Sequence, residues 1–258
     1  MKYFTGIDIG STASKVVVLD ETEMVDHFVL PTGWSSKETA AEVARRLTES
    51  GYPVDEDMRV VATGYGRVSV EYAAKTVTEI TCHGRGGYAL LGRDCTIVDI
   101  GGQDTKVITV EGGMPTSFLM NDKCSAGTGK FLEIMANRLN VDMGELFALA
   151  AEGTPLAISS MCTVFAESEV ISHIGAGERR EDIAAGVVDS VVNKVAGLCA
   201  RHTLKGDLLL TGGLCECGYL MDRLSKKLGV KVYSDPLGRY AGALGAALIA
   251  RGGKGRKA

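Results

Sequence analysis

The sequence predicts an α/β protein made of two related lobes. Apolar, β-branched runs alternate with helical patterns along the chain, which is typical of layered α/β folds. The segment Ile7–Val18 has an echo at Val98–Val110, and a pattern repeated within one chain indicates duplication. The 33 glycines and only five prolines favour many tight turns built on glycine. We therefore expect two duplicated lobes that face each other across a cleft.

Each repeated segment has the pattern of a β-hairpin. In both, an apolar strand ends in an aspartate (Asp8 or Asp99), and a polar turn with glycine follows. A lysine (Lys15 or Lys106) then leads into a second β-branched strand. Glycine at the bend of two such runs is typical of hairpins.

The other elements follow from hydrophobic periodicity and turn residues. Lys37–Ser50 is a predicted helix, because Ala40, Val43 and Leu47 fall on one face. Arg59–Thr63 is a predicted strand that leads into the turn Gly64–Gly66. Further along, the pattern predicts helices at Thr128–Leu139, Thr163–Ile174, Ile183–Leu204, Tyr219–Leu228 and Ala241–Arg251, with strands at Asp207–Leu210 and Val230–Tyr233.

Composition excludes several classes of function. The net charge is −4 and no basic stripe with interleaved aromatics occurs, so we expect no nucleic-acid partner. The basic tail Arg251–Ala258 is expected to be a solvated terminus. No apolar run approaches the ~20 residues that span a bilayer, and the N-terminus enters a strand pattern directly. With seven cysteines, an odd number, we expect free thiols or metal ligands in a reducing cytoplasm.

The two hairpin turns are candidate phosphate-binding sites. A turn such as Gly10-Ser11-Thr12 presents several backbone N–H groups in one direction, and glycine allows a phosphate to approach closely. Lys15 would add a positive charge. Bare phosphates would repel Asp8 and Asp99, so these side chains are expected to bind Mg²⁺ or its water ligands. The alternative is a pair of ordinary hairpins with glycine in their turns.

These motifs resemble those of the actin/hexokinase/heat-shock-chaperone ATPases. Ile7–Lys15 resembles their first phosphate motif, Val98–Lys106 their second and Leu208–Gly213 their adenosine motif. Pro236–Gly245 resembles the glycine-rich entry to the last helix. The resemblance implies ATP or ADP with Mg²⁺, and ribonuclease-H-like lobes at 1–95 (completed by the helix 241–258) and 96–240.

The same resemblance implies a set of site residues. Either Gln103 or Asp104 would orient the attacking water, and spacing alone does not decide between them. The residues implied to bind the nucleotide and its metal ion are Asp8, Gly10, Ser11, Thr12, Ser14, Lys15, Asp99, Gly101, Gly102, Gln103, Gly212, Gly213 and Gly242.

Two cysteines stand apart from the other five. Cys124 lies in a glycine-rich approach to a predicted helix, and Cys162 lies directly before another. Unpaired N–H groups at a helix start favour a thiolate or an anionic thiolate-ligated cluster. Buried apolar thiols are the commoner fate of intracellular cysteine. One chain also lacks the compact run of four cysteines that a cubane needs, so two chains would have to share it.

Almost the whole chain resembles the activator components of 2-hydroxyglutaryl-CoA dehydratase and the related BadF/BadG/BcrA/BcrD ATPases. Lys123–Lys130 and Ser160–Glu169 resemble the two cluster-ligand segments of that family. The resemblance implies that Cys124 and Cys162 from each subunit of a homodimer hold one [4Fe–4S] cluster. It also implies that reduced flavodoxin or ferredoxin loads the cluster, and that ATP hydrolysis drives electron transfer to a dehydratase or reductase with its own iron–sulfur cluster.

Several alternatives stay open from the sequence. The client could be a 2-hydroxyacyl-CoA dehydratase, a benzoyl-CoA reductase or a double-cubane-cluster reductase. A small-molecule kinase of the same fold would use the same turns, but would need an aspartate base aimed at a substrate hydroxyl, and the sequence shows no dedicated substrate lobe. A regulatory or assembly ATPase would have no reason to place two thiols at helix starts. Cys82, Cys95 and Cys199 are expected to be packing residues, and Cys215-Glu-Cys217 to lie in a loop near the nucleotide.

Overall fold

The computed structural model describes residues 2–252, and their contacts divide the chain into two compact units. The first unit comprises Met1–Ile97, Ile108–Phe118 and Asp235–Ala258, and the second comprises Val98–Val107 and Leu119–Ser234. The end of the basic tail, 253–258, lies outside the described residues, as does Met1. The division into lobes at 1–95 with 241–258, and at 96–240, stays a prediction.

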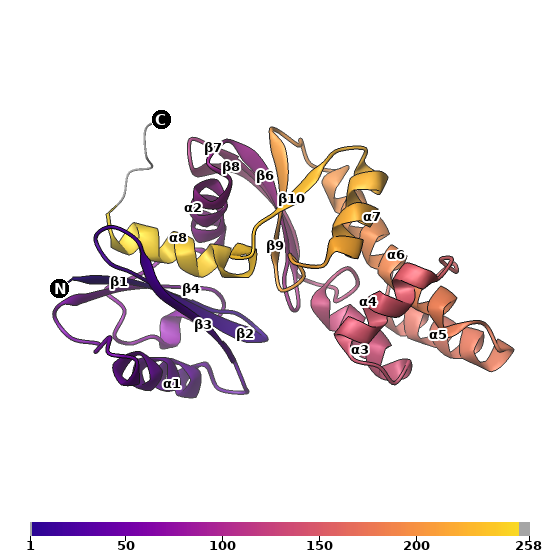
Figure 1. Ribbon diagram of the computed structural model, residues 1–258, viewed down its shortest axis with the longest axis horizontal. Coiled ribbons are helices and arrows are strands. Elements are labelled where there is room, and N and C mark those ends of the chain that lie inside the picture. The colour runs from indigo at the N-terminus through magenta and orange to yellow at the C-terminus, as the bar shows by residue number, and fades with distance from the viewer. Residues whose placement is uncertain (1, 253–258) are drawn as a thin grey trace. The chain divides into compact units, whose positions relative to one another are not determined.

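The first sheet has five strands in the order β3-β2-β1-β4-β5 (Figure 1). Strands β1 (Tyr3–Ile9) and β2 (Ala13–Leu19) form the first predicted hairpin, and their register places Asp8 opposite Lys15. Strand β3 (Met24–Pro31) extends the sheet on one side. On the other side, β4 (Met58–Thr63) runs parallel to β1, and the short β5 (Lys75–Thr76) follows. The hairpin therefore lies in the middle of the sheet, and most residues of β1 and β2 are buried.

Three helices pack in this unit. Helix α1 (Ser36–Glu49) begins where the Ser35 side chain accepts a hydrogen bond from the Glu38 N–H, which caps the free end of the helix. Helices α2 (Glu79–Leu91) and α8 (Ala241–Ala250) pack against each other, and α8 also packs against β1 and β4 (Figure 1). Short 3₁₀ turns at Arg67–Ser69 and Gly238–Tyr240 complete the connections.

Glycine allows the α2–α8 contact to be very close. A Cβ at Gly86 of α2 would overlap the Ala241 carbonyl, and a Cβ at Gly245 of α8 would overlap the Cys82 carbonyl. Helix α2 was not expected from the sequence, because Gly84, Gly86 and Gly87 each disfavour a helix by about 1 kcal/mol. Tertiary packing outweighs that propensity.

The second sheet also has five strands, in the order β10-β9-β6-β7-β8. Strands β6 (Cys95–Ile100) and β7 (Thr105–Glu111) form the second predicted hairpin, and β8 (Met114–Asn121) follows β7. Strand β9 (Asp207–Gly212) pairs in parallel with β10 (Val232–Ser234). β6 is buried at every position, as its apolar sequence predicts.

Helices α3 to α7 lie in the second unit. Their bounds are Gly129–Arg138 for α3, Met143–Glu152 for α4, Thr163–Ala176 for α5, Arg180–Cys199 for α6 and Gly218–Leu228 for α7. Helix α6 forms the centre of the core, with twelve buried residues that include Val187, Val188 and Val191. The predicted helix Ile183–Leu204 therefore begins earlier and ends five residues earlier than expected, because the chain turns at Arg201 and His202 to reach β9.

No helix in the described part of the chain is both long and apolar enough to cross a bilayer.

Candidate functional site

Hydrogen bonds from hydroxyl groups stabilise the first hairpin turn. The Gly10 N–H donates to the Ala13 carbonyl at 3.2 Å, which closes the turn. The Thr32 hydroxyl lies 2.8 Å from the Gly10 carbonyl and 2.8 Å from the Ser14 hydroxyl. Ser14, implied as a nucleotide-binding residue, is thus fully buried and bonded to Thr32, whereas Ser11 and Thr12 reach the surface. Sequence reasoning missed Thr32, which supports the turn from the end of β3.

The Asp8 carboxylate is almost completely buried in a space bounded by glycines. A Cβ at Gly64 would lie 2.5 Å from Oδ1 of Asp8, and a Cβ at Gly242 would lie 2.7 Å from Oδ2. The same Cβ at Gly242 would lie 3.0 Å from Nε2 of His83, a buried histidine of α2. Gly64 has φ +83°, which glycine adopts without strain. The structure thus brings Asp8 and Gly242 together, as predicted residues of one site, and adds Gly64 and His83.

The second hairpin contains a buried charge network. Nζ of Lys106 lies 2.8 Å from Oδ2 of Asp104 and 3.4 Å from Oδ2 of Asp99, and the lysine is only 3% exposed. The Thr211 hydroxyl on β9 donates to Oδ1 of Asp99 at 2.7 Å. Ala13 occupies the first hairpin where Asp104 occupies the second, so Lys15 has no ion pair within residues 2–252. The two hairpins are therefore alike in backbone but different in electrostatics.

This network distinguishes the two candidates for orienting water. The Asp104 carboxylate is buried against Lys106 and packs over Gly101, whereas Gln103 is exposed at the tip of the turn. Gly102 is half-buried beside it, and Gly213 is exposed after β9. Gly212 has φ +93°, and a Cβ there would overlap the Ile100 carbonyl.

Hydrogen bonds join the second hairpin turn to the start of α3. The Gly129 N–H donates to the Gly101 carbonyl at 2.9 Å, and the Lys130 N–H donates to the Gly102 carbonyl at 2.8 Å. The Thr105 hydroxyl donates to the Gly127 carbonyl at 2.7 Å. The predicted phosphate turn therefore contacts the loop that follows Cys124.

The structure brings together the two segments that carry Cys124 and Cys162. Sγ of Cys124 lies 3.6 Å from the Met161 carbonyl, and the hydroxyls of Ser125 and Thr163 lie 2.8 Å apart. Cys162 occupies the N-cap position of α5, and both thiols are half-buried. Two thiols at the surface, near the starts of α3 and α5, fit half of the ligand set of a four-thiolate cluster.

The other cysteines have different surroundings. Cys82 and Cys199 are buried in apolar cores, and this burial raises the pKa of Cys82 to about 12 and that of Cys199 to about 11. Cys95 and Cys215 are also buried. Burial raises the pKa of the half-buried Cys217 thiol at the start of α7. Among residues 2–252, no three or more His, Cys, Asp or Glu side chains are grouped to hold a metal ion.

An exposed apolar surface extends along α5 next to Cys162. Its members are large hydrophobic side chains, each at least 46% exposed: Met161, Val164, Phe165, Ile171 and Ile174. Contiguous apolar surface of this kind marks an interaction site more often than a free surface.

Comparison with known proteins identifies relatives along nearly the whole chain. Residues 5–250 match the family model described as the BadF/BadG/BcrA/BcrD ATPase family. The (R)-2-hydroxyglutaryl-CoA dehydratase activating ATPase of Acidaminococcus fermentans is 46% identical over 252 residues, which cover 96% of both chains. A benzoyl-CoA reductase component from Thauera aromatica is 30% identical, over 96% of this chain and 93% of its own.

Solved structures agree with these relatives. The crystal structure of the Acidaminococcus fermentans dehydratase component A superposes with a TM-score of 0.91, at 44% identity over 98% of each chain. The activator of the 2-hydroxyisocaproyl-CoA dehydratase from Clostridium difficile, solved with bound ADPNP, has a TM-score of 0.90 at 38% identity, over 97% of this chain and 94% of its own.

A more distant match concerns the fold alone. A ROK family glucokinase from Streptomyces griseus, with a TM-score of 0.60 at 16% identity, covers 97% of this chain and 100% of its own. Together with the closer structures, this likeness confirms the predicted actin/hexokinase-like fold.

Proposed function

This chain belongs to the BadF/BadG/BcrA/BcrD ATPase family, and from that premise we propose that it is an ATP-hydrolysing iron–sulfur activator. In this proposal the protein transfers a low-potential electron to a 2-hydroxyacyl-CoA dehydratase in the cytoplasm. The electron donor is flavodoxin or ferredoxin, and the partner enzyme carries an iron–sulfur cluster of its own.

The contact between the cysteine segments is the observation that supports this proposal most strongly. Cys124 and Cys162 come from segments 38 residues apart and are joined by the Cys124–Met161 and Ser125–Thr163 contacts. A [4Fe–4S] cluster takes four thiolates, so two such pairs from a homodimer would complete the set. The cluster supplies reversible one-electron chemistry when it is bound. The protein's own part is to present the two thiols at a surface where a second copy can add two more.

We assign ATP and Mg²⁺ to the glycine turns. The turn at Gly10–Thr12 with Lys15, and the turn at Gly101–Gln103, would bind phosphate oxygens through backbone N–H groups. Asp8 and Asp99 would hold Mg²⁺ or its waters, and Gly212, Gly213 and Gly242 would let the backbone approach the nucleotide. Gln103 is the better candidate for orienting the attacking water, because it is exposed at the tip of the turn, whereas the Asp104 carboxylate is buried over Gly101.

Backbone hydrogen bonds between the turn Gly101–Gly102 and the start of α3 suggest how ATP hydrolysis is linked to electron transfer. The turn Gly101–Gly102 accepts hydrogen bonds from the start of α3, five residues after Cys124. A movement of this turn on ATP binding or hydrolysis would be passed directly to the loop that carries Cys124. ATP then favours one conformer to the extent that it binds that conformer more tightly than the other.

A benzoyl-CoA reductase is a second candidate for the enzyme that this chain activates. The chain's 30% identity to a component of benzoyl-CoA reductase makes activation of a benzoyl-CoA reductase the alternative proposal. A double-cubane-cluster reductase is a third client of the same chemical kind. A small-molecule kinase is disfavoured, because the kinase-like match extends only to the fold.

Cysteine substitutions under anaerobic conditions test the proposal. We expect protein purified without oxygen to be brown, with about four irons per dimer. Cys124→Ser and Cys162→Ser should each lose the iron and electron transfer while keeping ATP affinity. Cys217→Ser is the matched control, because Cys217 is another half-buried cysteine at a helix N-cap. Iron-free wild-type protein after reconstitution, or a Cys124→Ser variant that still activates its partner, would rule the proposal out.

A further inference from the structure

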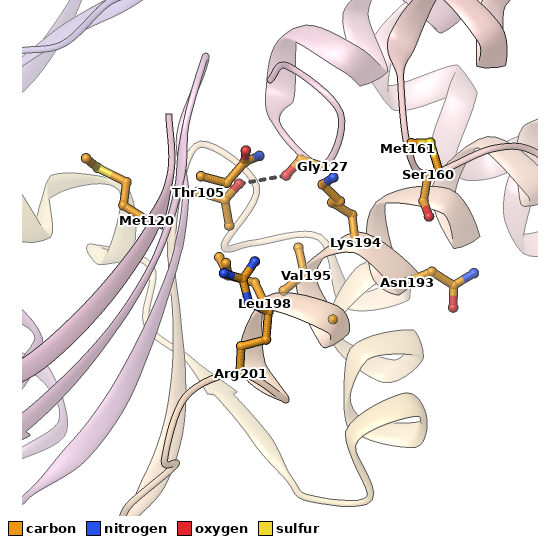
Figure 2. A pocket seen from close by; sticks show the side chains of 12 residues that line it. Thr105, Met120, Gly127, Ser160, Met161, Asn193, Lys194, Val195, Leu198 and Arg201 are labelled. Carbon is orange, nitrogen blue, oxygen red and sulfur yellow. Dashed lines mark hydrogen bonds between the residues drawn. The ribbon is translucent and has the colours of Figure 1, made fainter. Parts of the chain in front are cut away.

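A pocket of about 400 Å³ lies in the second unit, beside the loop that carries Cys124. Its walls come from the adjoining ends of β7 and β8, from Gly127, from Ser160 and Met161, and from the C-terminal half of α6 (Figure 2). None of the glycines that we assign to phosphate binding lines it. The pocket is therefore separate from the proposed nucleotide residues.

The pocket carries two positive charges and no negative one. Lys194 and Arg201 line it, and none of its lining residues is an aspartate or a glutamate. Neither cation forms an ion pair with another residue in 2–252. In Figure 2, Lys194 points from α6 toward Gly127, and the guanidinium of Arg201 points toward Thr105. Such a cavity attracts anions, because no carboxylate among its lining residues offsets the two positive charges.

The spacing of the cations indicates the size of the anion. Lys194 and Arg201 are seven residues apart, on α6 and just past its end, so they lie on one face with their Cα atoms about 10 Å apart along the axis. Between them the wall is uncharged, with Val195, Gly197 and Leu198 of α6. Two separated charges and an uncharged centre fit a ligand with two anionic charges on a short hydrocarbon body.

The remaining wall is the Cys124 loop itself. The Asn121 side chain donates to the carbonyls of Cys124 and Ala126, at 2.9 and 3.1 Å. A Cβ at Gly127 would lie 2.5 Å from Cγ of Lys194, so the loop packs directly on this lysine. Gly127 has φ +87°, which holds the loop in a conformation that other residues rarely adopt. Any ligand that draws Lys194 toward it would therefore act on the loop as well.

We propose that this pocket binds a small aliphatic dicarboxylate between Lys194 and Arg201. The bound anion neutralises the two cations and fixes the position of the Cys124 loop. The site is distinct from the nucleotide turns and acts on the cysteine segment from the side of α6.

Ligand-observed NMR on the full-length protein tests this site with glutarate and propyl phosphate as probes. ADP and Mg²⁺ are present throughout, so that any nucleotide site is occupied. We expect saturable transfer to glutarate, whereas propyl phosphate, which carries both charges on one group, should bind at least tenfold more weakly. Lys194→Gln and Arg201→Gln should each weaken glutarate binding at least tenfold, whereas Lys194→Arg, which keeps the charge, should restore it to within about threefold.

Lys226→Gln is the matched control, since Lys226 is an exposed lysine of α7 outside the pocket. It should bind the probe as the wild type does. A second readout is the alkylation rate of Cys124 in cluster-free protein, which the bound probe should change in the wild type and not in Lys194→Gln. The proposal would be overturned if glutarate showed no saturable binding to the wild type. It would also be overturned if Lys194→Gln and Arg201→Gln bound glutarate as tightly as the wild type does.

Discussion

Lys106 is almost fully buried, and two carboxylates share its charge. Asp99 and Asp104 flank its Nζ, and the Thr211 hydroxyl satisfies a further oxygen of Asp99. Burying charged groups is costly unless each is paired, so the network depends on every member. At the residue scale, this network holds the proposed Mg²⁺ ligand Asp99 in one orientation before any nucleotide arrives.

Removing the lysine charge should therefore destabilise the fold. We expect Lys106→Met to lower the free energy of unfolding by about 3–5 kcal/mol, because two buried carboxylates lose their counter-charge. Urea denaturation measures the change. Lys130→Met is the control, because Lys130 forms an exposed pair with Glu133, and its loss should cost less than about 1 kcal/mol. Equal effects of the two substitutions would contradict the interpretation of Lys106 as a buried charge partner.

Gly242 offers a second residue-scale prediction. Because a Cβ at this position would meet both the Asp8 carboxylate and the His83 ring, Gly242→Ala should displace Asp8 and lower the affinity for Mg²⁺-ATP. A tenfold loss corresponds to about 1.4 kcal/mol, and fluorescence titration with a labelled nucleotide would detect it. Gly175→Ala is the matched control, since a Cβ on this glycine of α5 meets nothing within 4 Å. Unchanged nucleotide affinity in Gly242→Ala would remove Asp8 from the proposed site.

At the scale of elements, the second hairpin and α3 behave as one connected segment. Two backbone hydrogen bonds and the Thr105 hydroxyl tie the turn Gly101–Gln103 to residues 127–130. Cys124 lies directly before this segment, and its neighbour Ser125 contacts Thr163 at the start of α5. A change at the turn therefore has a short, bonded route to both cysteine segments.

Thr105→Val tests this route. The substitution keeps the shape of the side chain and removes the donor to the Gly127 carbonyl, at a cost of about 1–3 kcal/mol. We expect nucleotide affinity to stay within about twofold. In cluster-free protein, the change in Cys124 alkylation rate on adding ATP should become smaller than in the wild type.

Thr116→Val serves as the control, because it is the same substitution in β8, where the hydroxyl donates to the Thr109 carbonyl and not to the loop. It should leave the effect of ATP on Cys124 unchanged. If ATP changes the Cys124 alkylation rate in Thr105→Val as much as in the wild type, the Thr105 hydrogen bond does not couple the turn to Cys124.

At the scale of the whole molecule, the exposed apolar surface of α5 favours assembly. Phe165 is 59% exposed and lies one turn beyond Cys162, so a second copy that covers this face would also bring its cysteines close. Large exposed side chains of this kind are unfavourable in water unless a partner covers them. The proposed dimer and the shared cluster are thus two consequences of one surface.

Phe165→Lys should weaken both together. We expect the dimer to dissociate at least tenfold more readily, as measured by analytical ultracentrifugation, and the iron content to fall with it. Phe118→Lys is the control, because Phe118 is similarly exposed, at 54%, but belongs to β8 and not to α5. A Phe165→Lys variant that stays dimeric with full iron content would show that another surface joins the subunits.

Elements that local patterns define were predicted more closely than elements that depend on tertiary packing. Both hairpins and helix α1 were predicted closely, because strong local patterns and a Ser cap define them. Strands β3, β5 and β8 and helices α2 and α4 were not expected. In α2 three glycines lower helix propensity, and only the close contact with α8 explains why they are there.

What the sequence by itself determined is the duplicated hairpin and the α/β order, and the choice of Cys124 and Cys162 among seven cysteines stays a prediction. These depend on local periodicity and on residue types next to helix starts. Only the tertiary structure decided that Lys106 is shared between Asp99 and Asp104, that Ser14 is buried against Thr32, and that His83 lies near Asp8. Such contacts join segments distant in sequence, and their energies depend on burial, which a local pattern does not contain.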